Sequence, residues 1–143
     1  MKLLPFILLS VGILFMGFGR ANSQCNSADY SQKCISKVQD GFTFLKSFNI
    51  DSQNGNKQKV EYSYVFSKDT QYFLNVCADG NDNGGIILTI YDSNRKVAST
   101  NHINGKLFPA IIFDCKSTGI YYISYTFENS SESCGGSVLA FRR

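Results

Sequence analysis

The 143-residue chain has few of the side chains on which catalysis and metal binding most often depend. It contains one histidine, His102, no tryptophan, and no C-x-x-C pair among its five cysteines. The cysteine spacing excludes the common zinc motifs, because His102 has no neighbouring ligand at a zinc-like offset. A serine hydrolase needs a base for its nucleophile, but no elbow motif surrounds any serine. We therefore expect His102 to be a solvated loop residue.

Paired carboxylates and phosphate-binding glycines are also scarce. Glycosidases use two facing carboxyl groups, whereas Glu61, Glu128 and Glu132 fall at a predicted strand edge and in a polar loop. Glycine-rich phosphate motifs open a helix, but Gly84-Gly85 and Gly135-Gly136 each precede a predicted strand. The sequence therefore predicts a protein that is not an enzyme.

Charge of one sign is not in excess either. Without Lys2 and Arg20, which lie in an N-terminal segment that we expect to be removed, 12 basic residues face 11 acidic ones. The basic residues are scattered, and only Arg95-Lys96 and Arg142-Arg143 are adjacent. Nucleic-acid binders usually carry a basic stripe, so neither nucleic acid nor anionic lipid is expected as a partner.

The first 23 residues have the three parts of a secretory signal peptide. Lys2 supplies the positive charge, an apolar run follows from 3 to 18, and Ala21 and Ser23 give an A-x-S cleavage site. The run is shorter than the ~20 residues of a membrane span. We therefore expect cleavage before Gln24, with no membrane span afterwards.

All five cysteines follow this site, as is typical of a chain exported to a compartment where disulfides persist. Lipidation of Cys25 is disfavoured, because Gln24 stands where lipoprotein signals have Gly, Ala or Ser. The expected organisation is a signal peptide at 1–23, a cysteine-containing segment at 24–41 and a β-sandwich domain at 42–143. The expected location is secreted or periplasmic, with attachment to the outer membrane through a partner left open.

Beyond residue 41, short aromatic and β-branched runs alternate with polar turns. Eight strands at regular spacing predict an all-β fold, a single jelly-roll-like antiparallel β-sandwich. Their spacing favours one hairpin of the second and third strands and another of the fourth and fifth. The predicted strands span 42–50, 61–66, 72–77, 86–91, 96–99, 107–115, 120–127 and 137–141. The expected core positions on them are Phe44, Phe48, Leu74, Val76, Leu88, Ile90, Ile111, Phe113, Ile123 and Val138.

Four segments in sequence order resemble the bacterial pre-peptidase C-terminal domain. They are 62–66 (YSYVF), 70–74 (TQYFL), 86–92 (IILTIYD, followed by a turn) and 118–123 (TGIYYI). The resemblance covers about residues 58 to 142 and implies a jelly-roll-like sandwich of the kind appended to secreted proteases. Arg95 replaces the usual glycine of the family's hairpin, and no peptidase domain precedes the sandwich. The chain is also similar to stand-alone exported proteins of Bacteroidota-type bacteria.

Residues 79–84 (DGNDNG) match the first six positions of the calcium loop D-x-[DN]-x-[DN]-G. The match ends there, because positions nine and twelve are Ile87 and Ile90, in a predicted buried strand. We expect a polar turn and no cofactor. Calcium is the alternative, and its ligands would be Asp79, Asn81 and Asn83.

The odd cysteine count leaves at least one thiol free or bonded to another chain. In jelly-roll wiring the first, eighth, third and sixth strands lie side by side, which brings Cys77 next to Cys134. Cys115 then lies at the opposite end of that sheet, beyond the roughly 7 Å that a bridge to Cys77 requires, although Cys25 or Cys34 could meet it there. The resembling exported proteins carry their N-terminal cysteines as a pair. That likeness, with the closeness in sequence, favours a Cys25–Cys34 bridge. The expected strand order favours a Cys77–Cys134 bridge, and Cys115 is then left as a buried free thiol.

The 12 phenylalanines and 8 tyrosines are expected mainly in the core and in cross-strand pairs. Tyr121 and Tyr122 are adjacent on a strand, so one of them must point outward. An outward aromatic face serves a protein interface or stacks on sugars. The predicted function is therefore a non-catalytic binding or accessory module of the bacterial cell envelope that engages another envelope protein, with a carbohydrate-binding module as the alternative.

Overall fold

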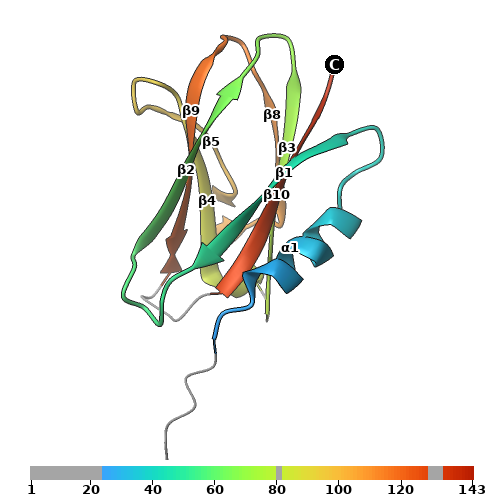
Figure 1. Ribbon diagram of the computed structural model, residues 1–143. Coiled ribbons are helices and arrows are strands. Elements are labelled where there is room, and N and C mark those ends of the chain that lie inside the picture. Colours follow the sequence, from blue (N-terminus) through green and yellow to red (C-terminus); the bar gives the residue numbers. More distant parts are fainter. Residues whose placement is uncertain (1–23, 80–81, 129–133) are drawn as a thin grey trace, which may run out of the picture.

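A computed structural model of the chain describes residues 24–79, 82–128 and 134–143, with the side chains of 82 and 83 excepted. The predicted signal peptide lies outside these residues. Two four-stranded antiparallel sheets face each other as a sandwich (Figure 1). Sheet A has the order β1 (Thr43–Asp51), β10 (Cys134–Arg142), β3 (Gln71–Ala78) and β8 (Ala110–Asp114), and sheet B has the order β2 (Lys59–Phe66), β9 (Gly119–Phe127), β4 (Ile86–Tyr91) and β5 (Val97–Thr100).

Three short elements complete the described chain. Helix α1 (Ser27–Ser36) precedes the sandwich, a 3-10 turn η1 (Asp82–Gly85) precedes β4, and a small hairpin of β6 (His102–Ile103) and β7 (Lys106–Leu107) joins β5 to β8. Within the described ranges, no helix is long and apolar enough to cross a bilayer.

The predicted all-β sandwich is confirmed. The predicted side-by-side order of the first, eighth, third and sixth strands is also confirmed, and these strands are β1, β10, β3 and β8 of the structure. The hairpin of the fourth and fifth strands is present as β4 and β5. The hairpin of the second and third strands was wrong, because β2 pairs with β9 in sheet B whereas β3 lies between β10 and β8 in sheet A. The turn after Phe66 carries the chain from one sheet to the other, and strand alternation alone does not distinguish such a crossing from a hairpin.

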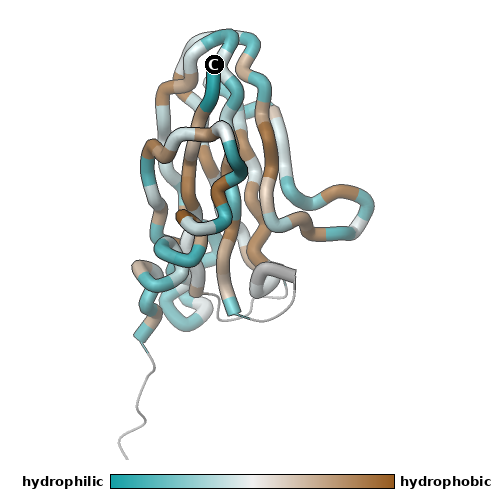
Figure 2. Tube along the Cα trace, turned by 90° about the vertical axis from the view of Figure 1, so that its right-hand side faces the viewer, coloured by the Kyte–Doolittle hydropathy of each residue, from teal (hydrophilic) through white to brown (hydrophobic). Residues whose placement is uncertain are grey.

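The core lies between the inner faces of the two sheets. Apolar residues follow the strands and hydrophilic residues the turns (Figure 2). On β4, Ile86, Leu88 and Ile90 all point inward and are fully buried. Phe66 stacks on Tyr72 from the facing sheet with ring centroids 4.0 Å apart. Burial of such side chains supplies the main driving force for this fold.

Three of the ten expected core positions differ from the prediction, one in being exposed, one in where it is buried and one in being only partly buried. Phe44 is 45% exposed, because a bulge between Phe44 and Lys46 shifts the strand by one residue and turns Phe44 to the outer face. Val138 is fully buried, but on the outer face of sheet A beside Cys34 and Cys77. Phe113 is only partly buried against the main core. The other seven positions are buried as predicted.

Candidate functional site

Helix α1 covers part of the outer face of sheet A, where it packs on β10 and on its neighbours β1 and β3 (Figure 1). The helix approaches β10 closely because residue 136 is a glycine. A Cβ atom built on Gly136 would lie 2.5 Å from the backbone nitrogen of Ser31. Below the helix, the Asn75 side chain donates to the carbonyl of Cys34 at 2.9 Å and accepts from the amide of Val138 at 3.0 Å. This part of the face, around Gly136, is therefore filled by packing within the chain.

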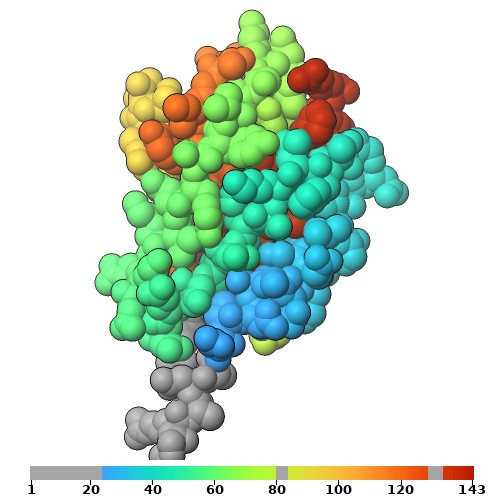
Figure 3. All heavy atoms as spheres, viewed as in Figure 1, coloured from blue at the N-terminus to red at the C-terminus, as the bar shows by residue number. Residues whose placement is uncertain are grey.

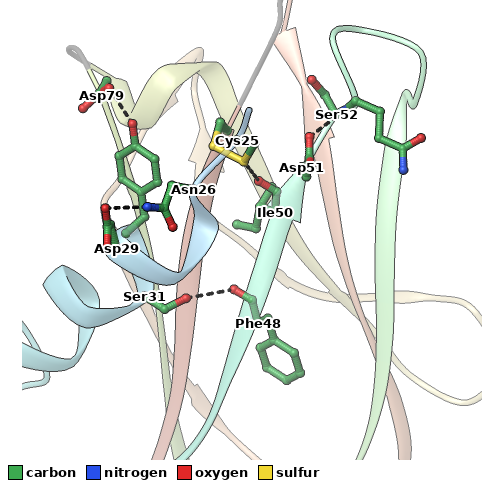
Figure 4. The surroundings of a disulfide bond; sticks show 12 residues. Cys25, Asn26, Asp29, Ser31, Phe48, Ile50, Asp51, Ser52 and Asp79 are labelled. Atoms are coloured by element: carbon green, nitrogen blue, oxygen red, sulfur yellow. Dashed lines mark hydrogen bonds between the residues drawn. A yellow bond between two sulfur atoms is a disulfide. The ribbon is translucent and has the colours of Figure 1, made fainter. Parts of the chain in front are cut away.

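Two disulfides attach this N-terminal segment to the sandwich. Cys25 is bonded to Cys134 with a Cα–Cα distance of 5.4 Å, and Cys34 is bonded to Cys77 at 5.7 Å. The first bridge lies beside the end of β1 (Figure 4). Each end of α1 is thus fixed to the sheet that it covers.

The predicted pairing, Cys25–Cys34 with Cys77–Cys134, was wrong. The sequence did not reveal α1, which begins at Ser27 and includes Cys34 but not Cys25. Packing of this helix on sheet A brings Cys34 to Cys77 and Cys25 to the start of β10 at Cys134. Cys77 and Cys134 do come near each other, as β10 and β3 are neighbours. Both point toward α1, however, and each bonds to a cysteine of that segment. Cys115 is the free cysteine and is buried.

A polar hollow of about 450 Å³ lies beside the Cys25–Cys134 bridge. The Asp79 carboxylate there accepts a hydrogen bond from the Tyr30 hydroxyl, which raises the pKa of Tyr30. Of the other two proposed calcium ligands, Asn81 lies outside the described residues and the side chain of Asn83 is not described. In the part of the chain that the structure describes, no three histidine, cysteine or acidic residues come together as metal ligands.

The structure places His102 close to an acidic side chain. It lies on β6, and its Nε2 atom is 3.8 Å from a carboxylate oxygen of Glu128. The Cys115 thiol is buried and lies 3.2 Å from the carbonyl of Ser117 and 3.7 Å from the Tyr121 hydroxyl.

The outer face of sheet B carries large exposed apolar side chains on three of its strands. Val65 on β2 and Ile120 on β9 are directly opposite each other and are 58% and 48% exposed. The next row across the sheet continues with Tyr122 on β9 and Tyr91 on β4 and ends at Val97 on β5, which is 61% exposed. These five residues form one surface, which we call the sheet B patch. The prediction that one of two adjacent tyrosines points outward is confirmed, since Tyr121 is buried and Tyr122 is half-buried in the patch.

Arg95 completes this surface from the β4–β5 turn. Its guanidinium carbon lies 3.6 Å from the centre of the Tyr122 ring, and its Nη1 atom donates to Glu61 at 2.7 Å. Lys59 lies 3.6 Å from the other oxygen of Glu61. The hydrogen bond to Glu61 raises the pKa of Arg95, so the guanidinium stays charged. Figure 3 shows the turn (yellow), β9 (orange) and β2 (green) side by side at the upper left.

The backbone of Arg95 has φ of +62°, a conformation that glycine adopts with less strain. This is the position where the resembling family usually has glycine, and here the side chain makes the contacts just described. The sequence pointed to an outward tyrosine but missed Arg95, Val65 and Ile120. The available signal was that Val65 and Ile120 are large and aliphatic at positions that alternate with buried ones.

Comparisons with known proteins give no family for this chain. Neither the family models nor the curated proteins include a match. Among solved structures, the chain is similar to PliG of Aeromonas hydrophila, a periplasmic inhibitor of g-type lysozyme. The two share 13% identity over 71% of this chain and 85% of the other, with a TM-score of 0.45. A likeness this distant has no bearing on function.

Proposed function

We propose that the protein is an exported, non-catalytic binding module that engages another protein of the cell envelope through the sheet B patch. The observation that carries this proposal is the exposed Val65–Ile120 pair, continuous with Tyr122 and the arginine stacked on it. Tyrosine and arginine are the side chains most enriched at the energetic centres of protein interfaces. A contiguous exposed apolar patch of this kind marks interaction sites on soluble proteins.

The chemistry of the patch favours a protein over a carbohydrate. Sugars stack on open aromatic faces, but the guanidinium of Arg95 already lies over the Tyr122 ring. The most exposed members of the patch, Val65, Ile120 and Val97, are aliphatic, and they pack against apolar protein side chains. The partner is therefore expected to present apolar side chains, with a carboxylate placed to meet Arg95.

Export to an oxidising compartment is part of the proposal. It is supported by the signal-like N-terminus and by the two disulfides, which persist outside the cytosol. Secretion or a periplasmic location both satisfy this reasoning. The likeness to the pre-peptidase C-terminal domain stays a prediction about the fold and adds nothing to the choice of partner.

Cross-linked affinity capture from the native envelope tests the proposal when variants are compared. Tagged mature protein is prepared as wild type, as Ile120→Lys and as Phe44→Lys. Phe44 is a matched control, because it is 45% exposed on the outer face of the other sheet. We expect one protein to be recovered with wild type and Phe44→Lys and lost with Ile120→Lys, since a lysine there buries a charge in the interface.

Two results contradict the proposal. Recovery of the same protein with Ile120→Lys would place the binding surface elsewhere. Binding of the wild type to a polysaccharide array, with loss of that binding in Ile120→Lys, would make the patch a carbohydrate site. Circular dichroism of each variant checks that the fold is unchanged.

A further inference from the structure

The four strands at the edges of the two sheets are unequally protected against pairing with another strand. Edge strands of soluble proteins usually carry charges or bulges, or are very short. Strand β1 has Lys46 and a bulge, and β2 has Lys59 and Glu61. Strand β5 has four residues and contains a bulge at Ala98. Strand β8 has the sequence Ala-Ile-Ile-Phe-Asp, with no charge before Asp114 and no bulge in its pairing with β3.

The backbone of β8 has one side free. The amide of Val76 donates to the carbonyl of Pro109, and the amide of Cys115 donates to the carbonyl of Thr70. In this register, odd-numbered residues of β8 bond to β3. The N–H and C=O groups of Ala110, Ile112 and Asp114 therefore point away from β3. Among the described residues, β3 is the one strand that pairs with β8.

The side chains beside this free edge are apolar on the outer face of sheet A. Ile112 is 45% exposed and pairs with Phe73, which pairs with Ala140, which pairs with Phe44. One apolar row thus crosses all four strands and ends at the open edge with Ile112. A groove of about 400 Å³ lies next to this row, and Lys37, Phe73 and Ala110 are among its lining residues.

We propose that a second copy of this chain pairs with β8 in an antiparallel, two-fold symmetric arrangement centred on Ile112. The unpaired backbone groups have the spacing that antiparallel pairing requires. Ile112 would exchange hydrogen bonds with Ile112 of the second copy, and Ala110 with Asp114 of the second copy. The apolar row continues across the axis, and two four-stranded sheets become one of eight strands. A two-fold interface must be self-complementary, and this strand meets that condition.

The charges at the ends of β8 agree with this pairing. The pairing places Asp114 of the second copy beside the small Ala110, at the border of the groove that Lys37 also lines. At each of the two symmetry-related grooves, the Asp114 carboxylate of one copy and the Lys37 ammonium group of the other are therefore brought together. Within one copy, Asp114 accepts a hydrogen bond from Gln71 at 2.7 Å through one of its two oxygens.

The proposal is independent of the sheet B patch, which lies on the other sheet. Analytical ultracentrifugation of the mature, disulfide-bonded protein over a range of concentrations tests it. We expect a monomer–dimer equilibrium whose dissociation constant rises by about tenfold or more in Ile112→Lys, because a charge on an edge strand blocks strand pairing. Phe44→Lys is the control, with the same 45% exposure on the opposite edge strand, and we expect it to leave the equilibrium unchanged.

Hydrogen exchange gives a second readout that needs no variant. Raising the concentration is expected to slow exchange at the amides of Ala110, Ile112 and Asp114, while Ile111 and Phe113, already bonded to β3, keep their rates. A wild type that stays monomeric at every concentration overturns the proposal. So does a dimer that persists in Ile112→Lys, or one whose formation protects other strands but not β8.

Discussion

The two outer faces of the sandwich differ in how the chain uses them. On sheet A a helix lies directly on a glycine and is tied down at both ends by disulfides. On sheet B, Val65, Ile120 and Val97 stay exposed around a tyrosine that is covered only in part, by Arg95. A small domain gains stability by covering apolar surface. The chain covers the part of sheet A around Gly136 with a disulfide-linked helix. It leaves the sheet B patch open, and our proposal gives this open face the role of binding surface.

The largest effect is expected from removal of the covalent attachment of α1. Cys25→Ala combined with Cys134→Ala opens a bridge between residues 109 positions apart. The chain-entropy model gives a loss of about 4 kcal/mol in unfolding free energy while the second bridge remains. Urea titration under non-reducing conditions measures it. A loss below about 1 kcal/mol would show that the bridge holds a segment that contributes little to the fold.

The close approach of α1 to β10 can be disturbed without touching the disulfides. Gly136→Ala places a methyl group 2.5 Å from the backbone of Ser31, and overpacking of this kind costs about 1–3 kcal/mol. Gly119→Ala is the control, since a Cβ there meets nothing within 4 Å. Unfolding midpoints of the two variants compare them. Equal midpoints would mean that the helix is free to shift away from the sheet.

Tyr121, the buried neighbour of Tyr122 on β9, gives a pH-dependent test of packing behind the sheet B patch. Burial and the nearby Cys115 thiol raise the pKa of Tyr121 to about 12, above its ordinary value of 10.0. The folded state thus favours the neutral phenol, and this contribution to stability is complete below pH 10 and is lost as the pH rises toward 12. Tyr121→Phe is expected to flatten the fall in unfolding free energy between these pH values. An unchanged pH profile would contradict the burial of this hydroxyl.

Arg95→Gly is expected to have the smallest effect on stability and a clear effect on binding. Glycine accepts the φ of +62° without strain, which offsets the loss of the contacts to Tyr122 and Glu61. We therefore expect the unfolding free energy to be unchanged or slightly raised. Affinity for the captured partner should fall by about tenfold, as for an arginine at an interface centre. Unchanged affinity, measured by biolayer interferometry, would remove Arg95 from the site.

The strands could be predicted from the sequence because alternation on β4 or β9 reports directly which side chains enter the core. The bulge at Phe44 and the crossing after Phe66 could not be predicted in this way. The bulge changes the face that a side chain occupies and the crossing changes the sheet, while both leave the local alternation of the sequence intact. The predicted disulfide pairing was wrong because the sequence did not predict α1. This helix lacks a strong helical pattern of its own and is held by its two bridges and by its contact with Gly136. In the sheet B patch, alternation predicted that one of Tyr121 and Tyr122 points outward, without saying which. Arg95 could not be predicted, because it acts through a contact with Glu61, 34 residues away in the sequence.

Photo-crosslinking in the native envelope compares the two faces most directly. A benzophenone amino acid is placed at position 120 on sheet B or at position 44 on sheet A, two sites of similar exposure. We predict a discrete adduct with one envelope protein from position 120 and none from position 44. An adduct from position 44 alone, equal adducts from both positions, or no protein adduct from position 120 would contradict the assignment of the open face as the binding surface.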